Sequence, residues 1–316
     1  MRVGQNPAKS IEHTPQPARL TVAVVNYIPF LSGYYAQSLE VLKTCLNSIW
    51  QNTPDPYDLL IFDNASCQEV QNYLIDAHQA GRIQYLVLSE KNMGKGGAWN
   101  FIFQAAPGEI IAYSDSDVYF HPGWLERSLE LLESFPRVGM VTARPLRTSE
   151  EFFTSTLTWA RSQPEAHLEQ GKFIPWDDFK EHTDSLGMSP DEAESRFQSM
   201  MDWKIEHRGQ VAYLGAAHFQ FIGWKHILQS QTPFPIDRPM GQVRTLDIRL
   251  NEAGYLRLMT SQPLVKDLGN RLDGPSAASL PSRVTKTRSR IALLKLSLVR
   301  RSMMWVYDAI FRLYFE

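Results

Sequence analysis

Short apolar runs alternate with stretches of helical periodicity between residues 20 and 143 of this 316-residue chain. The first run, Leu20–Tyr27, is rich in valine, and the stretch after it, Ser38–Gln51, has apolar residues three and four apart. Strands buried on both faces read as continuous apolar runs, and amphipathic helices show that spacing. The alternation therefore predicts a sheet built from βα units. Further strands are expected at Asp58–Phe62, Ile83–Leu88, Glu109–Tyr113 and Val138–Ala143, and further helices at Glu69–Ala80, Gly94–Ala105 and Trp124–Phe135.

The regular alternation stops near Ser149, and the stretch from about 149 to 210 is richer in aromatic residues, acids and helical spacing. It is interpreted as a helical insertion. A strand at Gln210–Leu214, an apolar run at His218–Trp224 and a helix around Val243–Ala253 then resume the domain. The expected organisation is a disordered lead at 1–18, a folded domain at 19–269, a linker at 270–282 and a C-terminal helix at 283–316.

The C-terminal segment differs from the rest of the chain in charge. Residues 283–316 carry a net charge of +6, the remainder carries −8, and the whole chain carries −2. Between Ala292 and Leu313, apolar residues recur at spacings of four and three, which predicts one amphipathic helix. Such a helix suits an anionic membrane surface, and it equally suits packing on protein, either the acidic body of the chain or a second subunit. The overall charge gives no case for nucleic-acid binding.

Cysteine usage and hydropathy bear on the compartment. Cys45 and Cys67 are too few for a disulfide framework, so both are expected to be reduced thiols. The first 19 residues have no apolar stretch of secretory-signal length, and no 18-residue uncharged apolar run occurs anywhere. We therefore expect a cytoplasmic protein, with attachment to the inner face of the membrane as the alternative offered by the C-terminal helix.

Carboxylates follow the predicted strand at Glu109–Tyr113. Asp115 and Asp117 flank Ser116 there, and ligands of open α/β sheets bind at the carboxyl ends of strands. Two carboxylates at such an edge can share a divalent cation with a diphosphate, since hard cations prefer oxygen ligands. A pair of turn-forming or helix-capping aspartates is the alternative, because aspartate is common in turns.

Two other strand ends carry polar groups. Asp63 and Asn64 end the second predicted strand, where an acid can accept hydrogen bonds from a nucleoside, or alternatively form a turn. The segment Asn92–Asn100, NMGKGGAWN, follows the third strand. Its glycines let backbone N–H groups approach a phosphate at a helix N-terminus, and Lys95 adds a positive charge. The segment matches neither the P-loop pattern nor the dinucleotide-binding pattern.

Taken in order, the segments VAVVNY, LLIFDNAS, NMGKGGAWN, IIAYSDSDVYF and LDIRLNEAGY resemble a family-2 glycosyltransferase over roughly Leu20–Gly269. The resemblance implies an α/β fold of the GT-A type, a Rossmann-like mixed sheet flanked by helices. It implies a nucleotide-sugar donor and a Mn²⁺ or Mg²⁺ cofactor, with Asp115 and Asp117 as metal ligands. The residues expected around the nucleotide-sugar are Asn26, Tyr27, Asp63, Asn64, Asn92, Gly94, Lys95, Asn100, Asp115 and Ser116.

On the acceptor side, the resemblance implies a carboxylate that deprotonates the acceptor hydroxyl. Asp247 is the matching acid, Asp237 is the reserve candidate, and a helix-surface ion pair is the alternative role for Asp247. Asp267 occupies the position where the family often has a metal-binding histidine, and an aspartate that caps the turn before Gly269 is the alternative. His218 lies in the region that would face both substrates, and a histidine among aromatic residues is more often a core residue.

These observations predict an enzyme that moves a sugar from a nucleotide-diphosphate sugar to a hydroxyl acceptor, a saccharide or lipid-linked saccharide. The resemblance implies metal dependence, inversion at the anomeric carbon and a place in glycan, polysaccharide or glycolipid synthesis. The alternatives are a sugar-phosphate nucleotidyltransferase and a non-catalytic carbohydrate-binding scaffold built on a decayed transferase. The first would normally have a glycine-rich basic loop after the first strand, where this chain has Asn26–Phe30.

Overall fold

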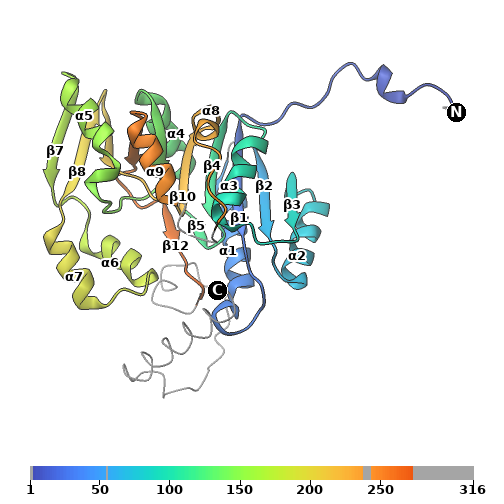
Figure 1. Ribbon diagram of the computed structural model, residues 1–316, viewed down its shortest axis with the longest axis horizontal. Helices are drawn as coiled ribbons and strands as arrows, with labels where there is room; N and C mark the ends of the chain where they lie inside the picture. Colours follow the sequence, from blue (N-terminus) through green and yellow to red (C-terminus); the bar gives the residue numbers. More distant parts are fainter. Residues whose placement is uncertain (1–2, 55, 238–242, 273–316) are drawn as a thin grey trace. The chain divides into compact units, whose positions relative to one another are not determined.

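A ten-stranded mixed sheet runs through the computed structural model, which describes residues 3–54, 56–237 and 243–272 (Figure 1). The order of strands across the sheet is β3-β2-β1-β4-β10-β6-β11-β9-β8-β7. The strands of this sheet are β1 Leu20–Asn26, β2 Tyr57–Asn64, β3 Tyr85–Ser89, β4 Ile110–Asp115, β6 Val138–Thr142, β7 Ala166–Gly171, β8 Asp202–His207, β9 Gln210–Leu214, β10 Gln220–Trp224 and β11 Leu256–Met259.

The parallel half of the sheet sets up the site. β1 pairs in parallel with β2 on one side and with β4 on the other, and β2 pairs in parallel with β3. The register places Asn26 opposite Asp63 and Val25 opposite Asp115. The chain moves outward from β1 to β3 and then returns to β4 across β1, which makes β1 and β4 the point where strand order reverses. Ligands of such sheets bind at this point, outside the carboxyl ends of the strands.

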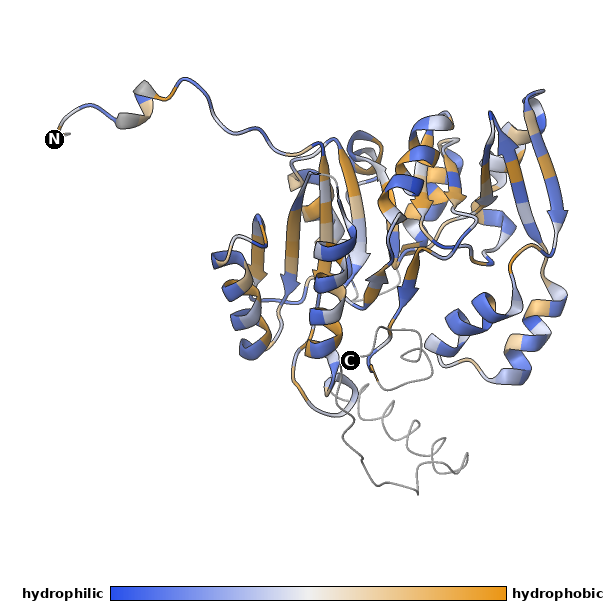
Figure 2. Cartoon of the chain, turned by 180° about the vertical axis from the view of Figure 1, so that it is seen from behind, coloured by the Kyte–Doolittle hydropathy of each residue, from blue (hydrophilic) through white to orange (hydrophobic). Residues whose placement is uncertain are grey.

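Helices cover both faces of the sheet. Alternate residues of the strands face opposite sides of the sheet. Val22 and Val24 belong to an apolar cluster with the helices on one face, and Ala23 belongs to a second apolar cluster with the helices on the other face. The central strands are accordingly coloured hydrophobic in Figure 2. The first face carries α1 Ser38–Asn52, α2 Gln68–Gln79, α4 Trp124–Ser134 and α5 Thr154–Ser162, and the second carries α3 Gly94–Ala105, α8 Lys225–Ser230 and α9 Val243–Glu252.

The segment from 149 to 210 is not helical alone. It contains α5, α6 Trp176–Ser185 and α7 Pro190–Ser199, together with the strands β7 and β8. β7 and β8 pair antiparallel with each other, and β8 pairs with β9, so the insertion lengthens the central sheet at one edge. Both strands mix charged with apolar residues, which conceals them from a search for apolar runs. Three short 3₁₀ helices lie at Pro7–Ser10, Gly33–Tyr35 and Glu150–Phe152.

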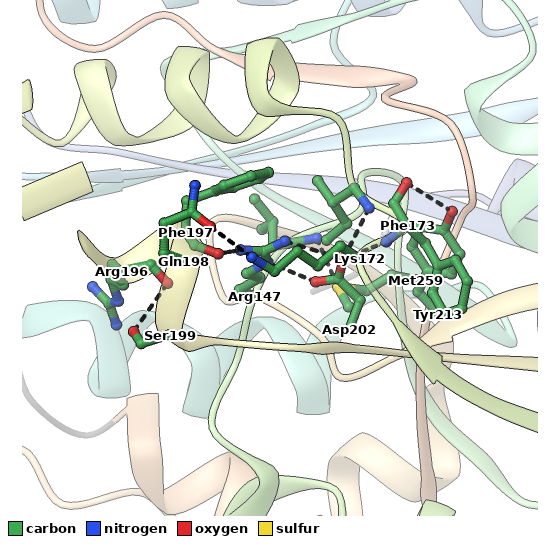
Figure 3. Close-up of polar contacts among 12 residues, drawn as sticks. Arg147, Lys172, Phe173, Arg196, Phe197, Gln198, Ser199, Asp202, Tyr213 and Met259 are labelled. Carbon is green, nitrogen blue, oxygen red and sulfur yellow. Dashed lines mark hydrogen bonds and ion pairs between the residues drawn. The ribbon is translucent and has the colours of Figure 1, made fainter. Parts of the chain in front are cut away.

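A buried ion pair ties the insertion to the sheet (Figure 3). Arg147 Nε donates to Asp202 Oδ1 at 2.6 Å, and both side chains are at most 2% exposed. Asp202 also accepts hydrogen bonds from the backbone N–H groups of Phe173 and Ile174, at 2.7 and 2.9 Å. Arg147 Nη1 donates to the carbonyl of Phe197 at the end of α7. The pair thus connects three parts of the insertion, namely β8, the turn before α6 and the end of α7, to the loop that follows β6.

A second, two-stranded sheet joins distant parts of the chain. β5, Val118–Phe120, pairs antiparallel with β12, Val265–Asp267, and Asp267 lies opposite Val118. The Leu268 N–H donates to the Asp117 carbonyl at 2.7 Å. The segment that follows the end of β4 is therefore held next to a segment from the end of the domain.

The α/β class and the mixed sheet flanked by helices are confirmed, and the strands and helices predicted up to residue 143 are present with small shifts of their ends. Apart from its 3₁₀ turn, the lead from residue 3 to 18 has no regular structure. The predicted basic helix at 283–316 and most of the linker at 270–282 lie outside the described residues. Within the described ranges, no helix is both long and apolar enough to cross a membrane.

Candidate active site

The ends of β1 and β2 form one buried polar network. Asn26 Nδ2 donates to Asp63 Oδ1 at 2.8 Å and to Ser66 Oγ at 2.9 Å, and the Ser66 N–H donates to Asp63 Oδ2 at 3.0 Å. Asn26 and Asp63 are fully buried. The Asn26 Oδ1 atom is buried and has no hydrogen-bond partner among the described residues. Buried polar atoms normally have partners, so this oxygen is an exception within the network.

The turn from β3 into α3 is shaped by side-chain contacts and a glycine. Asn92 Oδ1 accepts hydrogen bonds from the Gly94 N–H at 2.8 Å and from Asn64 Nδ2 at 2.9 Å. Gly94 has φ 68°, in the left-handed region that favours glycine. This conformation starts α3 with Lys95 facing the end of β4. Asn92 already takes the Gly94 N–H, so a phosphate at this helix terminus would meet Lys95 and the N–H groups that follow.

Lys95 and Asp115 form the centre of the site. Lys95 Nζ lies 2.8 Å from the carboxylate oxygens of Asp115, and it also donates to the His218 carbonyl at 3.2 Å. The Tyr113 hydroxyl donates to Asp115 Oδ1, and the Asp115 N–H donates to the Phe219 carbonyl at 2.7 Å. Burial and the Asp115 carboxylate raise the pKa of Tyr113 well above its usual range, so the tyrosine stays a hydrogen-bond donor. The orientation of Asp115 is therefore fixed before a ligand binds.

Two further carboxylates, those of Asp117 and Asp267, lie close enough to Asp115 to feel its charge. Burial, then the charges of Asp267 and Asp115, raise the pKa of Asp117 well above its usual range. Burial and the Asp115 charge likewise raise the pKa of Asp267. Both side chains keep some exposed surface, yet the surrounding protein removes enough water to disfavour their charged forms. Asp267 Oδ1 also accepts from the Gly269 N–H at 2.9 Å, so it caps its turn as well.

These carboxylates fit a hard divalent cation. Neighbouring carboxylates repel one another and so raise one another's pKa, and a bound cation reduces that repulsion. Carboxylate oxygens are also the ligands that Mg²⁺ and Mn²⁺ prefer. Within the residues that the structure describes, no three His, Cys, Asp or Glu side chains already have the arrangement of a metal-binding group. A cation here would therefore draw on one or two carboxylates and complete its shell with phosphate oxygens and water, as Mg²⁺ commonly does.

Asp247, the predicted base, lies on α9 and is 1% exposed. Its Oδ1 atom forms an ion pair with Nη2 of Arg257, and its Oδ2 atom accepts a hydrogen bond from His218 Nε2. The Arg257 side chain is buried too and donates to the carbonyls of Ala216 and Phe152, at 2.9 and 2.7 Å. Burial lowers the pKa of Arg257, and the charge of Asp247 works against that lowering. Both oxygens of Asp247 are therefore engaged by protein groups.

The remaining predicted residues lie on α3 and on the loops and turns around this centre. Asn100 Nδ2 donates to the Phe234 carbonyl at 2.9 Å and Asn100 Oδ1 accepts from the Phe234 N–H at 2.6 Å, so Asn100 anchors the loop before α9. Asp237 is an exposed residue of that same loop. Tyr27 lies just past β1 with its ring 6.3 Å from that of Tyr35, and Ser116 lies in the turn between β4 and β5.

Helix α6 of the insertion borders the carboxylates, because it packs beside β12 (Figure 1). Glu181 on α6 forms ion pairs with Arg144 at 3.0 Å and with Lys266 at 2.7 Å. His182 stacks against Phe219, and burial lowers the pKa of His182 to about 4. The insertion thus supplies one wall of the site.

Sequence reasoning missed Tyr113 and Arg257. Tyr113 lies two residues before Asp115 on the same strand. Residues two apart face the same side of a sheet, so this spacing indicates that the two side chains are neighbours. Arg257 interrupts the apolar run LRLM, and a charge in a buried strand requires a partner. The sequence therefore indicates that Arg257 has a buried acidic partner, but it does not identify which acid.

Sequence comparisons match the chain to glycosyltransferases. The sequence model described as "Glycosyl transferase family 2" matches residues 34–189. An uncharacterized glycosyltransferase of Nostoc sp. is 27% identical over 100 residues, which are 32% of this chain and 31% of that protein. The succinoglycan biosynthesis protein ExoW of Rhizobium meliloti is 26% identical over 120 residues, 37% of this chain and 35% of that protein. The matched regions span about a third of the length of these two curated relatives.

Two solved structures match the chain at low identity. A mannosyltransferase from Pyrobaculum calidifontis, solved with GDP-mannose and Mn²⁺, is 16% identical, with a TM-score of 0.48. That match covers 81% of this chain and 58% of the mannosyltransferase. TarS of S. aureus, residues 1–349, is 14% identical with a TM-score of 0.44, over 77% of this chain and 58% of that structure.

Proposed function

The chain belongs to glycosyl transferase family 2 through residues 34–189, and on that premise we propose that it transfers a sugar from a nucleotide-diphosphate sugar to a hydroxyl acceptor. The observation that carries the proposal is the group formed by Lys95, Asp115, Asp117 and Asp267 where the strand order reverses. Lys95 offers a positive charge to a diphosphate, and the carboxylates of Asp115, Asp117 and Asp267 offer oxygen ligands to a divalent cation, so the group suits a cation and a diphosphate bound together.

The donor is proposed to lie along the ends of β1, β2 and β4. The nucleoside is proposed to lie beside the network of Asn26 and Asp63, at the ends of β1 and β2. Lys95 lies on the other side of β1, where its ammonium group suits the diphosphate. Asp115, held by Tyr113 and Lys95, lies between these two regions.

We propose Mn²⁺ or Mg²⁺ as the cofactor, with Asp117, Asp115 and Asp267 as the candidate ligands. Bound there, the ion would stabilise the charge that develops on the nucleoside diphosphate as it leaves. On the acceptor side, the pair of Asp247 and His218 provides a proton acceptor within the same site. One displacement step assisted by a base inverts the anomeric carbon, so inversion is the proposed stereochemistry. A saccharide or a lipid-linked saccharide is the proposed acceptor.

A thermal-shift screen of the purified full-length chain tests the donor proposal. UDP, GDP, dTDP and CDP are added with Mn²⁺, with Mg²⁺ or with EDTA, because a ligand that binds the native state raises its stability. We expect one diphosphate to raise Tm only when a cation is present. The variant Asp117→Asn should lose that rise, and Asp191→Asn, an exposed acid on α7, should keep it.

The outcomes separate the proposal from its alternatives. No shift with any diphosphate and either cation contradicts the donor site and favours a non-catalytic scaffold. A cation-dependent shift with nucleoside triphosphates and sugar phosphates, without one for diphosphates, favours a nucleotidyltransferase. A shift that Asp117→Asn retains contradicts the assigned ligands while leaving the donor site in place.

The proposal includes a cytoplasmic enzyme whose basic segment, 283–316, attaches it to an anionic membrane surface or to protein. The net charge of +6 on residues 283–316 supports attachment to a membrane, because each basic residue near an anionic surface contributes about 1 kcal/mol of binding free energy. Deleting 283–316 should release the protein from anionic liposomes in a sedimentation assay. A loss of dimers in light scattering, with liposome binding unchanged, would favour packing on protein.

A further inference from the structure

Burial keeps the carboxylate of Asp247 out of reach of an acceptor hydroxyl. Arg257 takes Oδ1, His218 takes Oδ2, and only 1% of the residue is exposed. A general base must come within hydrogen-bond distance of the proton that it removes. Asp247 meets that requirement only if the buried pair with Arg257 opens, and opening would leave the charge of Arg257 without its counter-charge.

His218 lies between Asp247 and the exposed side of the site. Its side chain is 26% exposed, compared with 2% for that of Asp247. The Nε2 atom faces the carboxylate, which favours the tautomer that carries its proton on Nε2. The Nδ1 atom then carries the lone pair, and among the described residues the hydrogen bond of the imidazole is the one from Nε2 to Asp247.

The backbone around His218 is bonded to the donor side of the site. The His218 carbonyl accepts from Lys95 Nζ at 3.2 Å, and the same Nζ lies 2.8 Å from the Asp115 carboxylate. The next residue, Phe219, accepts from the Asp115 N–H at 2.7 Å. One lysine therefore joins the proposed diphosphate region to the backbone that carries the imidazole.

We propose that His218, oriented by Asp247, removes the proton from the acceptor hydroxyl; this inference rests on the function proposed above. The proton moves to Nδ1 while the acceptor oxygen forms its bond to the anomeric carbon. The bond from that carbon to the diphosphate oxygen breaks, and its electron pair leaves with the nucleoside diphosphate. Asp247 is a positioning residue in this step. Arg257 balances the charge of Asp247, so the main effect of the carboxylate is to fix the ring orientation and tautomer.

The experiment compares His218→Gln, His218→Ala and wild type as full-length proteins. Glutamine keeps a donor that can reach Asp247 and has no basic nitrogen, while alanine leaves room for an added imidazole. The probe is the release of nucleoside diphosphate from UDP-glucose, UDP-N-acetylglucosamine, GDP-mannose and dTDP-glucose, with Mn²⁺ and a mixture of free monosaccharides. His226→Gln, an exposed histidine on α8, is the matched control. Asp247→Asn is unsuitable, because it would leave the buried Arg257 uncompensated.

We expect both His218 variants to lose about 10²- to 10⁴-fold in kcat, the usual contribution of a general base. Binding of the nucleoside diphosphate, followed by thermal shift, should change less than about threefold, since the imidazole faces the acceptor. Imidazole in the buffer should restore part of the rate of His218→Ala and none of that of His218→Gln. His226→Gln should match wild type.

The inference is overturned if His218→Gln keeps a kcat within about threefold of wild type, or if imidazole fails to raise the rate of His218→Ala. A structural role alone would not respond to imidazole. A wild-type chain that neither binds a diphosphate with cation nor releases one overturns the proposed function, and the inference with it. An active wild type with an equally active His218→Gln overturns the inference only.

Discussion

Asp202→Asn tests whether the ion pair with Arg147 holds the insertion on the sheet (Figure 3). Asp202 accepts two hydrogen bonds from Arg147, at 2.6 and 3.3 Å, and one each from the N–H groups of Phe173 and Ile174. Asparagine keeps one acceptor oxygen and loses the charge, while the Arg147 side chain stays 1% exposed. Removing one partner of a buried pair costs about 3–5 kcal/mol, because the remaining charge is uncompensated.

Urea unfolding followed by tryptophan fluorescence measures the loss, which should appear as a lower midpoint at an unchanged m-value. The control is Glu165→Gln, whose partner Arg208 lies 3.6 Å away with both side chains about 70% exposed. That exposed pair should cost less than about 1 kcal/mol. A loss below about 1 kcal/mol for Asp202→Asn as well would refute the reasoning, and would mean that the apolar contacts of α6 and α7 hold the insertion by themselves.

Three further predictions concern titratable groups. Burial lowers the pKa of His182 to about 4, so the unfolded chain binds that proton first and stability should fall as pH drops from about 6.5 towards 4. His182→Phe should flatten that slope in urea midpoints at pH 7.5 and 5, and an unchanged slope would contradict it. The raised pKa of Asp117 means that its charged form costs stability at neutral pH, so Asp117→Asn should raise the Tm of the metal-free protein. The same variant should lose the rise in Tm that Mn²⁺ produces in wild type. An equal rise in both proteins would exclude Asp117 as a ligand. Burial raises the pKa of Cys45, so iodoacetamide at pH 8 should label the native chain at Cys67 at most. Labelling is measured by mass spectrometry. If Cys45 is labelled as fast in the native chain as in urea, the burial of Cys45 is contradicted.

The parallel half of the fold could be predicted because its signals are local. β1, β2 and β4 are apolar runs that end in polar residues, and the convergence of parallel strand ends then places Asp63 and Asp115 at one edge. The same reasoning misplaced Asn100 relative to that edge. Asn100 is six residues past the start of α3, about 9 Å along the helix axis, and it bonds Phe234 there.

The remaining features depend on partners that are distant in the sequence. β5 and β12 are three residues each, too short for any periodicity to be visible. The acid at Asp247 could be identified, but its burial depends on Arg257, which enters from β11. A sequence motif identifies a residue and the strand or helix that carries it. Whether its side chain contacts the substrate or another side chain depends on segments that are distant in the sequence.

The ladder between β5 and β12 has a consequence for the newly made protein. Asp117 and Asp267 are 150 positions apart, and their alignment depends on a strand that is among the last described parts of the chain. At about 5–20 residues per second, a ribosome needs roughly 8–30 s to add that length. During this interval the nascent chain already has Lys95 and Asp115 and lacks the third carboxylate. On the proposed function, Asp267 can therefore join Asp115 and Asp117 around a cation only after the end of the domain has left the ribosome.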